Sequence, residues 1–286
     1  MHSAEQLARA AVLGSGTMGH GIAQVLALAG LETCVYDVQE AALDKARTQV
    51  RANLDVGVEK GKVAPEARDL ALARLEFTTD FDKAVRRAEV VIEAVPEDLE
   101  LKRSLFSRLG RTASDVLLAT NTSSLSIARI AEAARSPERV VGMHFFNPVH
   151  LMKLVEVVRT PTSSRHAVNL AVDLATRLGK EPIVVEDAPG FASSRLGIAI
   201  GLEAIRMVEA GVAAPADIDK AMTLGYGFPM GPLRLTDLVG LDVRLSIAEY
   251  LARELGERFT PPQLLRDKVA RGELGKKSGK GFYDWP

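Results

Sequence analysis

The sequence lacks the features of disulfide-bonded, membrane-spanning and strongly charged proteins. One cysteine, Cys34, excludes an internal disulfide and leaves no thiolate cluster for a metal site. No apolar run approaches the roughly 20 residues of a membrane span, and the first nine residues lack the core of a signal peptide. A formal net charge of −1 argues against nucleic acid or an acidic membrane as the main partner. We therefore expect a cytoplasmic protein without a metal site.

Length and composition indicate two folded domains. At 286 residues the chain exceeds the usual size of one compact domain, and 47% hydrophobic with 26% charged residues is typical of a globular protein with a sizeable core. Alternating strand and helix patterns stop near Asp187-Ala188-Pro189-Gly190, and only helical patterns follow. We expect one domain at residues 1–188 and a smaller all-helical domain at residues 189–286.

A glycine-rich turn follows the first apolar run. Ala10-Ala11-Val12-Leu13 predicts a buried strand, and Gly14-Ser15-Gly16-Thr17-Met18-Gly19 leads into a helical pattern over residues 20–29. A second predicted strand, residues 33–36, ends in Asp37. The glycine pattern alone is a weak signal, but a strand before it, a helix after it and the later acid together predict a dinucleotide site.

Each residue of this pattern has a physical task. Gly14 makes the tight turn, Gly16 lets a pyrophosphate approach the helix N-terminus, and Gly19 lets helix and strand pack closely. Asp37 accepts hydrogen bonds from the adenosine ribose. Because Val38-Gln39-Glu40 contains no cation for a 2′-phosphate, the sequence favours NAD over NADP.

The following segments predict a mostly parallel sheet with one helical excursion. Residues 40–72 read as a charged helical pair broken near residues 57–62. Strand patterns then alternate with helices, which predicts right-handed crossovers between parallel strands. Glu93, the run 120–123 and His144 fall at the carboxyl ends of predicted strands, so we expect them to line one crevice.

The stretch from Val140 to Val158 contains a histidine and a glutamate in apolar surroundings. His144 ends the first run, the chain turns back at Asn147-Pro148, and Glu156 lies inside the second run. A carboxylate on one ring nitrogen would orient the imidazole as a catalytic base. The alternative is a core histidine bonded to a backbone carbonyl and a glutamate paired with an arginine. His150 is a second candidate base.

The run Asn121-Thr122-Ser123-Ser124 allows two interpretations. Ser123 or Ser124 could cap a helix over residues 127–134, which is the commoner use of such residues. Alternatively, one hydroxyl faces the crevice while the other caps. The residues themselves do not separate these interpretations.

The helical region predicts four helices, at residues 191–210, 214–224, 233–255 and 264–269. Apolar residues on the faces of a small helical domain are often buried against a second subunit. We therefore expect a homodimer formed through this domain.

With these residues in place, the chain resembles the short-chain 3-hydroxyacyl-CoA dehydrogenases, particularly the bacterial 3-hydroxybutyryl-CoA dehydrogenases. The resemblance covers about residues 10–285 and is carried by five motifs in order. These are GSGTMGHGIAQ at Gly14, NTSSLSI at Asn121, GMHFFNPVHLMKLVEVV at Gly142, PMGPLRLTDLVGLD at Pro229 and LGKKSGKGFYDW at Leu274. The resemblance implies a Rossmann-type domain, a helical dimerisation domain, and NAD-linked oxidation of an (S)-3-hydroxyacyl-CoA to the 3-ketoacyl-CoA.

The resemblance also implies roles for individual residues. The catalytic residues are His144, its partner Glu156, and the substrate-contacting Ser123. The implied cofactor-binding residues are Gly14, Gly16, Thr17, Met18, Gly19, Asp37, Glu93, Lys102 and Asn121. The implied substrate-binding residues, besides Ser123, are Asn147, Ser194 and Lys60.

Two departures from the family pattern concern the substrate. The family usually reads GFxxNRL where this chain has Gly190 to Leu196, so Ser194 replaces an asparagine that reaches the substrate carbonyl. Of two lysines expected for the CoA phosphates, one matches Lys60 and the other is Val56. Both changes bear on the acyl chain and on CoA affinity more than on the type of reaction.

Three other readings share parts of these patterns. Dehydrogenases of gulonate or carnitine have the same fold with a different loop after the histidine. The lysine-dependent beta-hydroxyacid dehydrogenases share the glycine pattern but lack a histidine–glutamate pair at this spacing. A non-catalytic NAD-binding relative is the third reading, to which the Ser194 change adds weight and against which the set Ser123, His144 and Glu156 stands.

Overall fold

The chain folds into two compact units, as a computed structural model of residues 3–110 and 116–286 shows. The units are Met1–Asp187 and Ala188–Pro286, so the division falls one residue before the expected boundary. In the two described stretches, no helix is both long and apolar enough to cross a membrane.

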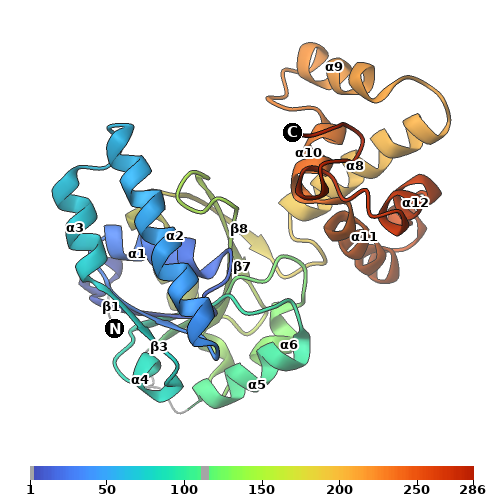
Figure 1. Cartoon of the computed structure of the whole chain (residues 1–286). Coiled ribbons are helices and arrows are strands. Elements are labelled where there is room, and N and C mark those ends of the chain that lie inside the picture. The colour runs from blue at the N-terminus through green and yellow to red at the C-terminus, as the bar shows by residue number, and fades with distance from the viewer. Residues whose placement is uncertain (1–2, 111–115) are drawn as a thin grey trace. The chain divides into compact units, whose positions relative to one another are not determined.

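An eight-stranded sheet forms the centre of the first unit (Figure 1). The strands lie in the order β3-β2-β1-β4-β5-β6-β7-β8, and all neighbouring pairs are parallel except β6 and β7. Their bounds are β1 Arg9–Leu13, β2 Glu32–Tyr36, β3 Leu75–Thr78, β4 Val90–Glu93, β5 Leu117–Thr120, β6 Val140–Phe145, β7 Leu154–Arg159 and β8 Glu181–Glu186. The predicted α/β class with a mostly parallel sheet is confirmed.

Helices cover the sheet and explain its apolar central strands. Every residue of β4, β5 and β6 is buried, which is why these strands read as continuous apolar runs and not as alternating ones. Residues of α1 and α7 share one hydrophobic core with the sheet. The helices are α1 Gly19–Leu28, α4 Phe81–Val85, α5 Leu99–Leu109, α6 Ile127–Ala131 and α7 Arg165–Arg177, with short 3-10 turns at Ala4–Gln6 and Pro137–Arg139.

The predicted helical excursion is the pair α2 Glu40–Glu59 and α3 Pro65–Ala73, which packs against α1 (Figure 1). Val50, Leu54 and Ala71 form a small core there with Ala27 of α1. The chain reverses at Gly61, whose φ of 64° suits glycine. The turn therefore carries the flanking lysines at its exposed end.

The second unit is entirely helical in its described structure apart from short bridges near the C-terminus. Its helices are α8 Ser193–Glu209, α9 Pro215–Gly225, α10 Pro232–Val239, α11 Leu241–Leu255 and α12 Gln263–Ala270, with 3-10 turns at Glu257–Phe259 and Lys276–Ser278. The prediction of a single helix over residues 233–255 was wrong. Gly240 adopts a φ of 103°, which ends α10 and starts α11.

Gly142 in β6 lets this strand pack closely against the side chains of Ile127 and Val158. A Cβ at this position would lie 2.3 Å from Ile127 Cδ1 and 2.9 Å from Val158 Cβ. Overpacking a tight core typically costs about 1–3 kcal/mol. We therefore expect Gly142→Ala to lower the free energy of unfolding by an amount in this range, measured by denaturant titration followed by circular dichroism.

Gly16→Ala is the matched control for this substitution, because a Cβ at Gly16 meets no atom within 4 Å. Its free energy of unfolding should change by less than about 0.5 kcal/mol. Equal losses of stability in the two variants would show that crowding is not what Gly142 relieves.

Candidate active site

The glycine turn between β1 and α1 has the geometry that a dinucleotide phosphate requires. Gly14 has a φ of 97°, and a Cβ at Gly19 would lie 1.8 Å from the Gly14 carbonyl oxygen. At Gly16 the space beside the backbone is open. Glycine is therefore required for conformation at the first position and for close packing at the last, while the middle one leaves room for a ligand.

Asp37 lies beside this turn, directly after β2. Its Oδ2 accepts hydrogen bonds from the backbone N–H and the hydroxyl of Ser15, at 2.9 and 2.8 Å. Its Oδ1 accepts from the Gln39 N–H at 3.1 Å. The carboxylate is thus held next to the turn, where an adenosine ribose binds in this fold.

His144 and Glu156 face each other across the only antiparallel pair of neighbouring strands in the described sheet. They are register partners on β6 and β7, and His144 Nδ1 lies 2.8 Å from Glu156 Oε2. Because a carboxylate accepts, Nδ1 carries the proton, and in the neutral imidazole the basic lone pair is then on Nε2. Glu156 is completely buried, so the predicted contact between the two is present and lies away from water.

The loop after β6 is tied down on both sides. Asn121 Oδ1 accepts a hydrogen bond from the Phe145 N–H at 2.9 Å, which joins the end of β5 to the end of β6. The Lys180 ammonium donates to the carbonyls of Val149 and Met152. Burial lowers the pKa of Lys180. These bonds hold the segment that carries Asn147, whose peptide bond to Pro148 is cis.

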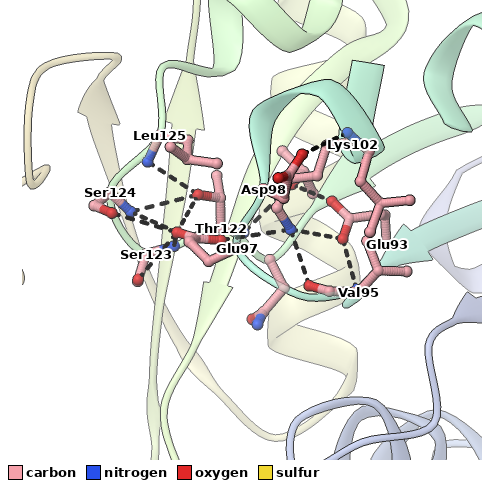
Figure 2. A network of polar contacts seen from close by, with 12 residues as sticks. Glu93, Val95, Glu97, Asp98, Lys102, Thr122, Ser123, Ser124 and Leu125 are labelled. Carbon is pink, nitrogen blue, oxygen red and sulfur yellow. Dashed lines mark hydrogen bonds and ion pairs between the residues drawn. The ribbon is translucent and has the colours of Figure 1, made fainter. Parts of the chain in front are cut away.

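Glu97 is the functional candidate that sequence reasoning missed (Figure 2). Its Oε1 accepts from the Thr122 hydroxyl at 2.6 Å, from the Ser123 N–H at 2.9 Å and from the Ser124 N–H at 3.2 Å. The Ser123 hydroxyl also lies 3.2 Å from this oxygen. Glu97 precedes a helix and belongs to no pattern of its own, so its spacing to the serines gave no signal.

This network corrects the expected use of the two serines. Neither Ser123 nor Ser124 caps α6; the cap is Ser126, whose hydroxyl accepts from the Arg129 N–H. The helix also ends earlier than expected, at Ala131. Ser126 fulfils the capping role because it immediately precedes the helix, while the earlier serines reach Glu97.

Lys102 joins Glu97 to a fully buried acid, Glu93. Its ammonium lies 2.7 Å from Glu93 Oε1 and 3.5 Å from Glu97 Oε2 (Figure 2). Glu93 Oε2 accepts from the Thr120 hydroxyl at 2.6 Å. Glu93 and Lys102 are almost completely buried and form an ion pair with each other. Their contact with the cofactor remains a prediction.

Burial and charge act in opposite directions on these acids. Burial raises the pKa of Glu93, against the opposing effects of Lys102 and Thr120. Burial also favours a higher pKa for Glu97, but the Lys102 charge and the hydrogen bonds from Thr122 and Ser123 outweigh it and lower the pKa. Glu97 is therefore the more firmly ionised of the two.

Two adjoining cavities of the first unit lie beside the loop that follows His144. One, of about 220 Å³, is lined by Thr17, His20, Gly21, Gln49, Asn53, Asn147, Pro148, Val149 and His150. The other, of about 540 Å³, shares Asn53 and His150 with it and reaches Val56, Lys60 and Lys62 at the hairpin turn. Burial and the Lys180 charge lower the pKa of His150. His150, the second candidate base, thus lines both cavities, and none of the described residues provides a carboxylate partner for it.

The remaining substrate candidate, Ser194, lies in the second unit. It is the second residue of α8 and is half-buried. It follows Phe191, the one non-glycine residue with positive φ in the described chain, at 48°. This bend directly precedes the helix that carries Ser194.

The sheet order, the glycine turn with Asp37 and the buried histidine–glutamate pair define a class of protein: a two-domain, Rossmann-type dehydrogenase that uses NAD. Family models give the particular family. The model "3-hydroxyacyl-CoA dehydrogenase, NAD binding domain" matches residues 9–188, and "3-hydroxyacyl-CoA dehydrogenase, C-terminal domain" matches residues 190–285. The chain belongs to the 3-hydroxyacyl-CoA dehydrogenase family, as its motifs indicated.

Individual relatives match over nearly the whole chain. A 3-hydroxybutyryl-CoA dehydrogenase of Mycobacterium tuberculosis is 45% identical over 98% of this chain and 99% of its own length. A 3-hydroxyadipyl-CoA dehydrogenase of Escherichia coli is 44% identical over 96% of this chain and 58% of its own length. The crystal structure of (S)-3-hydroxybutyryl-CoA dehydrogenase from Ralstonia eutropha has a TM-score of 0.93 at 37% identity, covering 98% of this chain and 99% of that one.

The charge on Glu97 predicts a pH-dependent contribution to stability. A carboxyl whose pKa is lowered by folding stabilises the fold above its ordinary value of 4.5, and this stabilisation is lost as the pH falls through the lowered pKa. We expect Glu97→Gln to be less stable than the parent at neutral pH, with a difference that shrinks below pH 4.5. Denaturant titrations at several pH values measure this.

Glu100→Gln, an exposed residue in the first turn of the following helix α5, is the control and should show no comparable change. A stability deficit in Glu97→Gln that is the same at neutral and acid pH would exclude the charge of Glu97 as its cause.

Proposed function

We propose that this 3-hydroxyacyl-CoA dehydrogenase acts on short-chain (S)-3-hydroxyacyl-CoA, such as 3-hydroxybutyryl-CoA, and catalyses the reverse reduction of the 3-ketoacyl-CoA. The contact between His144 and Glu156 carries this proposal, because it supplies an oriented base inside an NAD-binding fold. The short-chain preference is supported by the relatives, several of which are named 3-hydroxybutyryl-CoA dehydrogenases.

His144 accepts the proton of the substrate 3-hydroxyl at Nε2, since Nδ1–H is bonded to Glu156. The buried carboxylate stabilises the imidazolium that forms and keeps the ring in one orientation. Bound NAD supplies the hydride acceptor, C4 of its nicotinamide. In the reverse direction the imidazolium returns the proton to the oxygen.

Ser123 holds the reacting oxygen by hydrogen bonding. Its hydroxyl has one proton, which in the structure is directed to Glu97. Rotation of this hydroxyl toward the substrate would leave the two backbone N–H bonds of Ser123 and Ser124 to Glu97 intact. Glu97 is thus a positioning residue, while Asn147 and Ser194 complete the proposed substrate contacts.

The glycine turn and Asp37 hold the pyrophosphate and adenosine ribose of NAD. The open space at Gly16 and the carboxylate beside it fit these groups. Thr17, Met18 and Asn121 belong to the same proposed cofactor site. Glu93 and Lys102 contribute to this site indirectly, because their ion pair holds the Lys102 ammonium near Glu97 and so influences the charge and position of Glu97.

The CoA moiety occupies the two adjoining cavities. Its phosphates require cations, and Lys60 and Lys62 line the larger cavity without an ion pair to any described residue. Lys180 also lines it, but its ammonium is bonded to two carbonyls. Val56 lies in the same cavity, so the expected second lysine is replaced there by an apolar contact.

A His144→Ala variant tests the catalytic assignment. Proton transfer by a positioned side chain contributes about 10²–10⁴-fold, so turnover should fall by at least about 10²-fold. NADH binding should persist, because the glycine turn is untouched. Consumption of NADH with acetoacetyl-CoA measures turnover, and NADH fluorescence measures binding.

His166→Ala, on the exposed surface of α7, is the control and should retain full turnover. Undiminished turnover in His144→Ala would overturn the assignment, and a loss in His150→Ala instead would identify that residue as the base. Free hydroxy acids in the same assay distinguish acyl-CoA substrates from gulonate or carnitine types.

We propose further that the chain forms a homodimer through its second unit. Large apolar side chains are exposed there at the end of α9 and just after it, with Leu224 83%, Tyr226 78% and Phe228 37% exposed. Such groups typically mark contact surfaces.

Light scattering should give about twice the chain mass of 30.8 kDa. Leu224→Glu combined with Tyr226→Glu should shift the protein toward the monomer mass, whereas a monomeric parent protein would refute the proposal.

A further inference from the structure

A cavity of about 520 Å³ lies at the amino ends of the first strands of the sheet, within the first unit. Its walls come from the starts of β1, β2 and β3, from the end of α3, and from α4 with the segment after it (Figure 1). The glycine turn, Glu93 and Thr120 stand at the carboxyl ends of parallel strands of this sheet. Since a five-residue strand such as β1 is about 17 Å long, the cavity and the candidate active site lie at opposite edges of the sheet.

Cations outnumber acids in this cavity, although the whole chain has a formal net charge of −1. Five cationic and two acidic side chains line it. The cations are Arg9, Arg74, Lys83, Arg86 and Arg87, and the acids are Glu32 and Glu76. The cavity therefore has a local excess of positive charge that the rest of the molecule does not share.

Three of these cations have no acidic partner. Lys83 pairs with Glu76 at 2.5 Å, whereas Arg74, Arg86 and Arg87 form no ion pair with any described residue. The C-terminal ends of helices attract cations, and Arg74 and Arg86 directly follow α3 and α4. However, α4 has only five residues and so few aligned peptide dipoles, which do not account for two successive arginines at its end.

The cavity combines these cations with an apolar wall. Arg9 Nε donates to the Arg87 carbonyl oxygen at 3.1 Å, which joins the start of β1 to the segment after α4. Leu70, Ala73 and Leu75 line the side formed by α3 and β3. A guanidinium binds phosphate through two parallel hydrogen bonds, and an apolar wall suits the flat organic part of a ligand.

We propose that this cavity binds a nucleoside diphosphate, at a site separate from the cofactor and substrate sites. Such a ligand carries about three negative charges at neutral pH, which matches the excess of three cations. Its phosphates meet the unpaired arginines, and its base packs against the apolar wall. Ligand pockets typically have volumes of about 300–1,000 Å³, and this cavity of about 520 Å³ lies in that range.

Cys34 lines the cavity and is the only cysteine of the chain, so its labelling reports on this site alone. Burial raises the pKa of its thiol to about 11, so we measure the rate of maleimide labelling at alkaline pH by mass spectrometry. Saturating ADP should slow the labelling by at least about 5-fold, because the bound ligand covers the thiol. Binding of ADP at the glycine turn, at the other end of the strands, leaves Cys34 uncovered.

Arg86→Gln combined with Arg87→Gln removes two unpaired charges. The ADP concentration that gives half-maximal protection should rise by at least about 10-fold, while turnover with acetoacetyl-CoA stays unchanged. Arg165→Gln combined with Arg253→Gln removes the same charge from exposed positions elsewhere and should leave the protection unchanged. In the parent protein, inorganic pyrophosphate should protect more weakly than ADP, and adenosine should not protect.

Each outcome supports or overturns the proposed site. Labelling of the parent protein that ADP does not slow overturns it, whether or not the variants fold. Equal protection of the parent and the variant that lacks both Arg86 and Arg87 overturns it as well. Equal protection by pyrophosphate and ADP refutes a nucleotide ligand, because the apolar wall then contributes nothing. Absence of turnover with acetoacetyl-CoA in the parent protein bears on the proposed function and not on this site.

Discussion

The proposed chemistry depends on one buried hydrogen bond, between His144 Nδ1 and Glu156. It exists because the chain reverses direction between β6 and β7, in a sheet whose other neighbouring strands are parallel. Directly opposed residues of an antiparallel pair have Cβ atoms about 4.5–5.5 Å apart, close enough for an imidazole and a carboxylate to bond. The reversing loop is held by Lys180, and Asn121 holds the end of β6.

A second polar cluster lies at the ends of β4 and β5 and contains buried charges, whose burial is unfavourable. Lys102 is shared between Glu93 and Glu97, so one cation partly neutralises two acids. Such a network is stabilising only when its members are satisfied, and here Thr120, Thr122 and the backbone of Ser123 complete it. The result is an ionised Glu97 that holds the serine loop in one conformation.

Within the proposed function, the two units have separate tasks. The first carries the base and the cofactor site, and its sheet contains the strand order β3-β2-β1-β4-β5-β6 that is typical of the Rossmann fold. The second carries Ser194, one of the proposed substrate contacts. A change of substrate can therefore come from side chains in either unit while the histidine–glutamate pair stays the same.

Much of the fold was readable from local patterns. The glycine turn, the helical hairpin and the buried strands each have a periodicity or a spacing that reports the surroundings of the chain within a few residues. The helix predicted over residues 233–255 failed because a glycine inside a helical pattern is tolerated, and the pattern does not show that Gly240 adopts positive φ.

The sequence by itself determined the α/β class, the glycine turn with Asp37, and the candidate pair His144 and Glu156. Only the tertiary structure decided that this pair is in contact and that Glu97, and not α6, engages Ser123. The physical reason is the separation along the chain of the residues that interact. Strand and helix periodicity arise from neighbours along the chain, whereas partners such as Glu97 and Ser123 are brought together by the sheet and leave no periodic trace in the sequence.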